Sequence, residues 1–252
     1  PEDILKKYGA DILRIWVASS NYAEDLRIDF SILDQHADSY RKIRNTFRYL
    51  LGNLNDNFKK IDIEKLDLNQ LPELEQYMLH RIYDLNENYK NYFKSYDFHN
   101  LYKELLNFCT VDLSAFYFDI RKDALYCDTK DSEKRKSSII VLNIILESLI
   151  KWFAPILSFT TEEIFILINK NEKSIHLEKF IKFPKSFENT REQFTELMWE
   201  IELGGVQHIW CEDFTRLTRN YEDQVKIEKL IMDNDIYIYE GLMNNQIYES
   251  NE

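Results

Sequence analysis

Residues 31–55 read SILDQHADSYRKIRNTFRYLLGNLN. Their apolar residues recur three and four positions apart, which is the spacing of one face of an α-helix. These residues are Ile43, Phe47, Leu50, Leu51 and Leu54. Ser31 and Asp34 have the spacing of a capping box, so we expect the helix to begin at Ser31. The stretch therefore predicts a long amphipathic helix.

The same stretch carries a row of basic and amide side chains beside its apolar face. The row consists of Arg41, Lys42, Arg44, Asn45 and Arg48. Spacings of three, four and seven place most of them on one side of the helix. Guanidinium groups in a row can bind successive phosphates, and an amide can add a sugar or base contact. The alternative is that the arginines pair with acidic residues of neighbouring segments, such as Asp11 or Glu24.

Similar patterns predict further helices along the first two-thirds of the chain. They cover residues 2–8, 10–18, 72–95, 99–118, 132–153 and 160–168, the last opened by a second capping box, Thr160-x-x-Glu163. Residues 53–70 are expected to form a loop, and residues 119–132 a compact charged connection. Long amphipathic segments joined by short loops predict a mainly α fold, a helix bundle.

The composition supports this fold and excludes several others. The chain has 252 residues, of which only five are glycine and four are proline. Tight hairpins and phosphate-binding loops use glycine heavily, so the composition argues against dinucleotide folds, P-loops and β-barrels. At 44% hydrophobic and 30% charged residues, the chain is long enough to bury one large core or two small ones.

The acidic residues are concentrated at the end of the chain. The formal net charge is −12, but residues 192–252 hold 14 acidic and four basic residues, whereas residues 1–191 hold 30 and 28. The basic row therefore lies in a nearly neutral region, where phosphate binding is feasible. The acidic tail would repel phosphate. It shows little periodicity, although residues 236–239 could form a strand.

No group of residues predicts a catalytic or metal site. The five histidines are dispersed, and Cys109, Cys127 and Cys211 have no zinc-ligand spacing. Sparse cysteines and the lack of a secretory signal predict a cytoplasmic protein. The most apolar stretch, residues 139–157, is interrupted by polar and charged residues, so no membrane span is expected.

Six motifs of the chain resemble one family, the isoleucyl-tRNA synthetases, which are class I aminoacyl-tRNA synthetases. The motifs are PEDIL (1–5), YGADILRIW (8–16), YRKIRNTFRYLLGN (40–53), NFCTVDLSAFY (107–117), DIRKDALYC (119–127) and APILSFTTEE (154–163). The resemblance covers about residues 1–168. The segments LSAFY and KDALY look like the isoleucine enzyme rather than the valine or leucine enzymes.

The resemblance implies a domain organisation and a function. Residues 1–30 would be a short helical linker that follows a catalytic domain. Residues 31–187 would be a helical anticodon-binding domain, and residues 188–252 an irregular, divergent acidic tail. Arg41, Lys42, Arg44, Asn45 and Arg48 would bind tRNA, with isoleucine tRNA as the expected partner. The parent enzyme would attach isoleucine to tRNA with ATP and magnesium.

The sequence also departs from the family. The catalytic signatures His-x-Gly-His and Lys-Met-Ser-Lys-Ser, the editing domain and the cysteine-rich zinc module are absent from this stretch. We therefore expect no catalytic residue, metal or cofactor here, and expect ATP and magnesium to bind in the catalytic domain of the same polypeptide. Two alternatives remain: a free-standing helical interaction protein whose acidic tail binds a basic partner, and the matching region of a valyl- or leucyl-tRNA synthetase.

Overall fold

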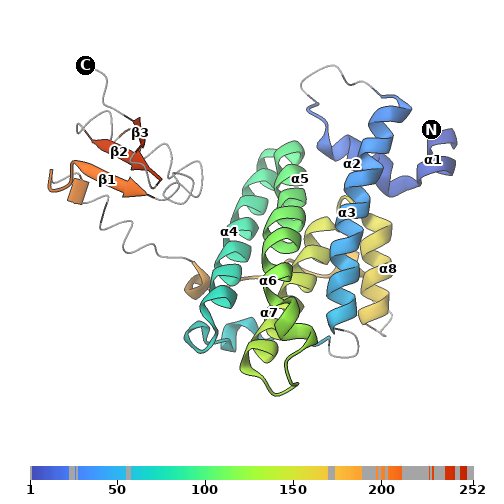
Figure 1. Ribbon diagram of the computed structural model, residues 1–252. Coiled ribbons are helices and arrows are strands. Elements are labelled where there is room, and N and C mark those ends of the chain that lie inside the picture. Colours follow the sequence, from blue (N-terminus) through green and yellow to red (C-terminus); the bar gives the residue numbers. More distant parts are fainter. Residues whose placement is uncertain are drawn as a thin grey trace. The chain divides into compact units, whose positions relative to one another are not determined.

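In the computed structural model the chain forms two compact units, Pro1–Glu188 and Asn189–Glu252 (Figure 1). The first unit is almost entirely helical, which confirms the predicted mainly α fold. The structure describes residues 2–22, 26, 28–54, 58–169, 174–188, 197, 200–201, 204–211, 227, 229, 236–241 and 245–248.

A central helix, α7 (Glu133–Phe153), organises the first unit. Every residue from Val141 to Phe153 is buried. Such a helix needs apolar residues around its whole circumference, and the isoleucine- and leucine-rich sequence of α7 supplies them. The helices that pack against it are α3 (Phe30–Leu54), α4 (Glu73–Ser95), α6 (Phe118–Tyr126) and α8 (Ser158–Ile168). Figure 1 shows α4 at one edge of this bundle, and α3 and α8 at the other.

Two short helices precede the bundle, α1 (Glu2–Tyr8) and α2 (Ala10–Ser19), as the sequence predicted. Gly9 separates them with a φ of 83°, a left-handed conformation that suits glycine. Helix α2 packs against α3, α5 (Phe98–Asn107) and α8, and Ile15 lies in the core of the bundle. The segment that contains α2 is therefore part of the helical unit.

Polar contacts also fix α2 to the turn between α7 and α8. The carboxylate of Asp11 accepts hydrogen bonds from the backbone N–H groups of Phe159 (3.3 Å) and Thr160 (2.9 Å). Arg14 donates to the backbone carbonyls of Pro155 and Ile156. One helix thus satisfies free backbone donors at the start of α8 and free acceptors just after α7.

Helix α5 (Phe98–Asn107) continues without a break into η4 (Phe108–Tyr117), which is π-helical, and then into α6. The predicted helix ended near residue 118, and the compact connection predicted for residues 119–132 was wrong over its first half. Helix α6 continues to Tyr126 because Phe118, Ala124 and Leu125 turn inward and are buried. Its charged residues lie mostly on the outward side, which made the segment look like a loop.

Both predicted capping boxes are wrong, although the helices they marked are present. At the start of α3, the carboxylate of Asp29 accepts from the N–H of Ile32 (2.9 Å) and from the Ser31 hydroxyl (2.6 Å). These two hydrogen bonds lower the pKa of Asp29. Helix α8 begins at Ser158, two residues before Thr160, and Asp11 of α2 supplies its cap.

Two irregular segments cross the bundle, and both contribute lining residues to a groove beside α7. Residues 58–72 contain the short 3-10 turns Ile63–Lys65 and Leu68–Gln70. Residues 174–188 contain the turns Ile175–Leu177 and Lys185–Phe187. Ile63, Ile175 and Phe187 are buried and anchor these segments to the core.

The second unit holds three short strands within the tail that was predicted to be irregular. Strand β2 (Tyr237–Glu240) coincides closely with the strand considered for residues 236–239. It pairs in parallel with β1 (His208–Cys211) and antiparallel with β3 (Asn245–Tyr248). A cluster of buried isoleucines, Ile201, Ile209, Ile227, Ile236 and Ile238, forms its core. Most acidic residues of this tail lie outside the described residues.

None of the helices in the described ranges combines the length and the apolar character that a membrane crossing requires.

Candidate nucleic-acid interface

The outer face of α3 is the surface on which the predicted binding residues meet. Its opposite face is buried through Ile43, Phe47, Leu50 and Leu54, as the apolar spacing predicted. The side chains on the outer face are therefore directed to solvent by the packing of the helix. From Arg41 to Arg48, seven positions further on, this face extends by about 10 Å along the helix axis.

All five residues predicted to bind tRNA are exposed on this helix, and we call them the basic stripe: Arg41, Lys42, Arg44, Asn45 and Arg48. Arg41 forms an ion pair with Asp38, one turn earlier on the same helix. Within the described residues, the other four side chains have no ion pair or hydrogen bond to a protein group. The stripe therefore contains at least three cationic groups that a ligand can reach without breaking a protein contact.

The proposed alternative, that the arginines pair with neighbouring acids, fails for Asp11, because the carboxylate of Asp11 is used at the start of α8. Glu24 lies outside the described residues. Asp34, at the other end of α3, accepts a hydrogen bond from the Tyr8 hydroxyl (2.7 Å). The acidic residues of the outer face are thus confined to its N-terminal half, and the basic residues to its C-terminal half.

A polar and aromatic seam joins the basic stripe to η4 and α6. The rings of Tyr49 and Phe118 stack with their centroids 4.1 Å apart, and the Tyr49 hydroxyl donates to the Phe118 carbonyl (3.4 Å). The Asn53 amide donates to the Tyr126 hydroxyl (3.3 Å). Burial, with a smaller contribution from the nearby Tyr126 hydroxyl, raises the pKa of Tyr49 to about 12. Tyr49 is therefore neutral at physiological pH and acts as a hydrogen-bond donor.

A buried charged cluster fixes α6 in place. Glu75 of α4 is fully buried and forms a bidentate pair with Arg121 of α6, with N–O distances of 2.7 and 2.6 Å. The hydroxyls of Tyr117 and Ser138 also donate to this carboxylate, each at 3.1 Å. Because the cluster connects α4, η4, α6 and α7, it sets the position of the seam beside α3. The structure thus gives Arg121 a role in packing α6 against α4.

A second charged group links α4, α5 and η4. Arg81 lies 3.1 Å from Asp112 and 3.7 Å from Glu104. Burial raises the pKa of both carboxyl groups, and the Arg81 charge lowers them by less. One oxygen of Glu104 is buried and has no hydrogen-bond partner among the described residues. Arg81 is therefore committed to these carboxylates.

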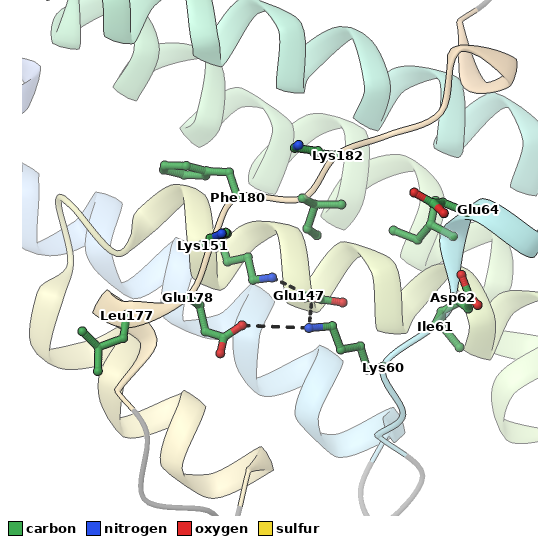
Figure 2. A pocket seen from close by; sticks show the side chains of 13 residues that line it. Lys60, Ile61, Asp62, Glu64, Glu147, Lys151, Leu177, Glu178, Phe180 and Lys182 are labelled. Carbon is green, nitrogen blue, oxygen red and sulfur yellow. Dashed lines mark hydrogen bonds and ion pairs between the residues drawn. The ribbon is translucent and has the colours of Figure 1, made fainter.

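Figure 2 shows a groove where the two irregular segments cross α7, with a volume of about 700 Å³. On its floor, Lys151 donates to Glu147 at 2.7 Å, and both side chains are buried. The exposed Lys60 lies 3.8 Å from Glu147 and 3.9 Å from Glu178. Since its basic and acidic lining residues are equal in number, the groove has no net charge to select a polyanion.

No group of three or more His, Cys, Asp or Glu side chains in the described part of the chain could hold a metal ion. The expectation that ATP and magnesium bind elsewhere in the polypeptide remains a prediction. Sequence reasoning missed Tyr126, because residues 119–132 were not expected to be helical. Phe118 and Leu125 are seven residues apart, which is a helical spacing, and Ala124 adjoins Leu125. This pattern is the signal that could have predicted the helix that ends at Tyr126.

Comparison with known proteins agrees with this arrangement of helices and side chains. Residues 75–229 match the family described as the anticodon-binding domain of tRNA ligase. The match covers more than half of the chain, so the chain belongs to this family.

Similar curated proteins are isoleucine–tRNA ligases. That of Pelagibacter ubique is 85% identical over 189 residues, which are 75% of this chain and 21% of that protein. Those of Mesorhizobium japonicum and Geobacter sulfurreducens are 43% and 45% identical, over 75% and 73% of this chain and 19% and 20% of those proteins. The chain therefore spans about one fifth of the length of the curated relatives it matches.

Proposed function

We propose that this chain binds the anticodon arm of tRNA through the basic stripe on α3. The observation that carries the proposal is the exposure of Lys42, Arg44 and Arg48 on one helix, free of protein ion pairs among the described residues. Arginine binds phosphate oxygens with two parallel hydrogen bonds, so successive guanidinium groups can follow an RNA backbone. Contacts of this kind position the RNA, and base contacts provide the specificity.

The stripe would act within a larger enzyme. We infer that the polypeptide attaches isoleucine to its tRNA in the cytoplasm, with ATP and magnesium bound by a catalytic domain outside this chain. Residues 1–30 would then be the linker from that domain, and residues 31–187 the anticodon-binding domain. The high identity to isoleucine–tRNA ligases over three-quarters of the chain supports this proposal.

The proposal is tested by measuring how the affinity of the 252-residue chain for isoleucine tRNA depends on salt. Each phosphate contact that is lost should reduce the slope of log K against log salt concentration by about 0.7 to 0.9. We expect Arg44→Gln and Arg48→Gln each to lower the slope by this amount. Lys94→Gln is a matched control, because Lys94 is an exposed cation on the last turn of another helix, α4.

Two results would contradict the proposal. One is the absence of tRNA binding even at low salt. The other is a slope that the Lys94 control lowers as much as the Arg44 and Arg48 variants do, because binding would then depend on net charge alone. Competition among isoleucine, valine and leucine tRNAs separately tests the isoleucine specificity, which we expect to favour isoleucine tRNA.

A further inference from the structure

Tyr126, the last residue of α6, combines high exposure with a fixed position. Tyr126 is 65% exposed, yet its hydroxyl accepts a hydrogen bond from the Asn53 amide. That amide also donates to the Tyr49 carbonyl at 2.9 Å, so its own orientation is set. The polar end of Tyr126 is anchored, and the ring remains open to solvent.

The ring lies at the end of the basic stripe. Asn53 follows Arg48 by five residues on α3, a rise of about 7.5 Å along the helix axis. Between them, Gly52 is exposed and has open space where a side chain would be. The surface between the guanidinium of Arg48 and the ring of Tyr126 is therefore unobstructed by any side chain at Gly52.

The surroundings of Tyr126 favour a nucleotide over a purely apolar partner. Lys122 lies one turn earlier on α6, and its ammonium group is 3.0 Å from Asp119. Tyr126 offers a stacking face with Lys122 as a cation beside it, whereas both hydrogens of the Asn53 amide are used by the Tyr49 carbonyl and the Tyr126 hydroxyl. A stacking face beside a cation suits an unpaired base with its phosphate.

We propose that Tyr126 is a stacking surface for an unpaired base of the RNA whose phosphates follow the basic stripe. This inference rests on the proposed function, and it adds an aromatic, base-stacking residue to a surface whose charged side chains contact phosphates. Asn53 would be a positioning residue, because it holds the ring through its hydroxyl. The ring can stack on any base, so it would contribute affinity and loop geometry rather than base identity.

The test uses the 252-residue chain and an RNA stem-loop with the anticodon arm of isoleucine tRNA. A fluorescent adenine analogue replaces one unpaired loop nucleotide at a time, because stacking on an aromatic ring quenches it. We expect quenching at one loop position in the wild-type complex. Tyr126→Leu should abolish this quenching and weaken binding roughly 5- to 150-fold, with an unchanged salt slope.

Two further variants keep the test interpretable. Tyr126→Phe retains the ring and should retain the quenching, so it separates stacking from loss of the Asn53 hydrogen bond. Phe159→Leu removes an equally exposed ring, 68% exposed on α8, and should change neither affinity nor quenching. Thermal unfolding of each variant establishes that the fold is kept.

The outcomes distinguish this inference from the proposed function. If Arg44→Gln and Arg48→Gln lower the salt slope but Tyr126→Leu retains wild-type quenching, the stacking role is overturned and the backbone contact stands. If Tyr126→Leu and Phe159→Leu weaken binding equally, the role of Tyr126 is also overturned. If the wild-type chain does not bind the stem-loop, both proposals fail.

Discussion

The charged cluster around Glu75 and the basic stripe on α3 use the same kind of side chain in opposite ways. Arg121 is largely buried and paired at 2.6 Å with a carboxylate that has no solvent exposure. Arg44 and Arg48 are exposed and, within the described residues, unpaired. A buried ion pair must be complete to be tolerated, whereas an exposed cation costs little to hold ready for a ligand. The first region specifies the fold, and the second is available for function.

The largest expected effect comes from breaking the buried cluster. Glu75→Leu leaves the Arg121 guanidinium without its partner, and it should lower the free energy of unfolding of the helical unit by about 3–5 kcal/mol. Urea unfolding followed by far-ultraviolet circular dichroism measures this loss. The double variant Glu75→Leu/Arg121→Leu should recover part of it. A loss below about 1 kcal/mol in the single variant would remove the contrast with the stripe.

A smaller effect is expected at the N-terminus of α8. Asp11→Ala removes the acceptor for two backbone N–H groups, and loss of such a cap costs about 0.5–2 kcal/mol. Hydrogen exchange should show faster exchange of the first amides of α8. Asp11→Asn keeps an acceptor oxygen and serves as the control. Equal destabilisation by both variants would mean that the carboxylate charge, rather than the cap, is what matters.

Lys60 provides an intermediate case, because it touches a buried pair from the outside. Its side chain is 71% exposed, and its distances to Glu147 and Glu178 are long, at 3.8 and 3.9 Å. Exposed pairs contribute about 0–1 kcal/mol, so Lys60→Ala should lower the free energy of unfolding by no more than that. Thermal unfolding checks it. A loss above about 2 kcal/mol would show that Lys60 belongs to the buried network.

The smallest effect on stability is expected in the stripe itself. Arg48→Gln should change the free energy of unfolding by less than about 0.5 kcal/mol, because the side chain has no protein partner among the described residues. The same variant should lower the salt slope of RNA binding. Measuring both on one preparation sharpens the comparison. A clear loss of stability would assign Arg48 to the fold instead of to the ligand.

Local sequence patterns predicted most helices and the exposed stripe. The apolar spacing through Ile43, Phe47 and Leu50 determines which face of α3 is buried, and therefore which face carries Arg44 and Arg48. This information is contained within a few turns of one helix. It does not depend on how the rest of the chain folds.

Contacts between distant segments were not predictable in the same way. The cap of α8 comes from Asp11, 149 residues before Thr160, so the local pair Thr160 and Glu163 was misleading. The end of α6 was not predicted because its charged sequence is typical of a loop. Arg121 can lie in a helix that faces the core because the distant Glu75 neutralises its charge. The position of the Tyr126 ring depends on that helix and on Asn53, and could not be predicted without them.

The link from α2 to the α7–α8 turn has a consequence for the order of assembly during synthesis. Asp11 and Arg14 leave the ribosome long before the backbone groups they bind. At 5–20 residues per second, synthesis of the 149 residues between Asp11 and Thr160 takes about 7–30 s. Throughout that time Ile15, which ends in the core, has no completed bundle to enter. Helix α2 therefore reaches its final packing only after α8 has been synthesised, so this part of the bundle closes last.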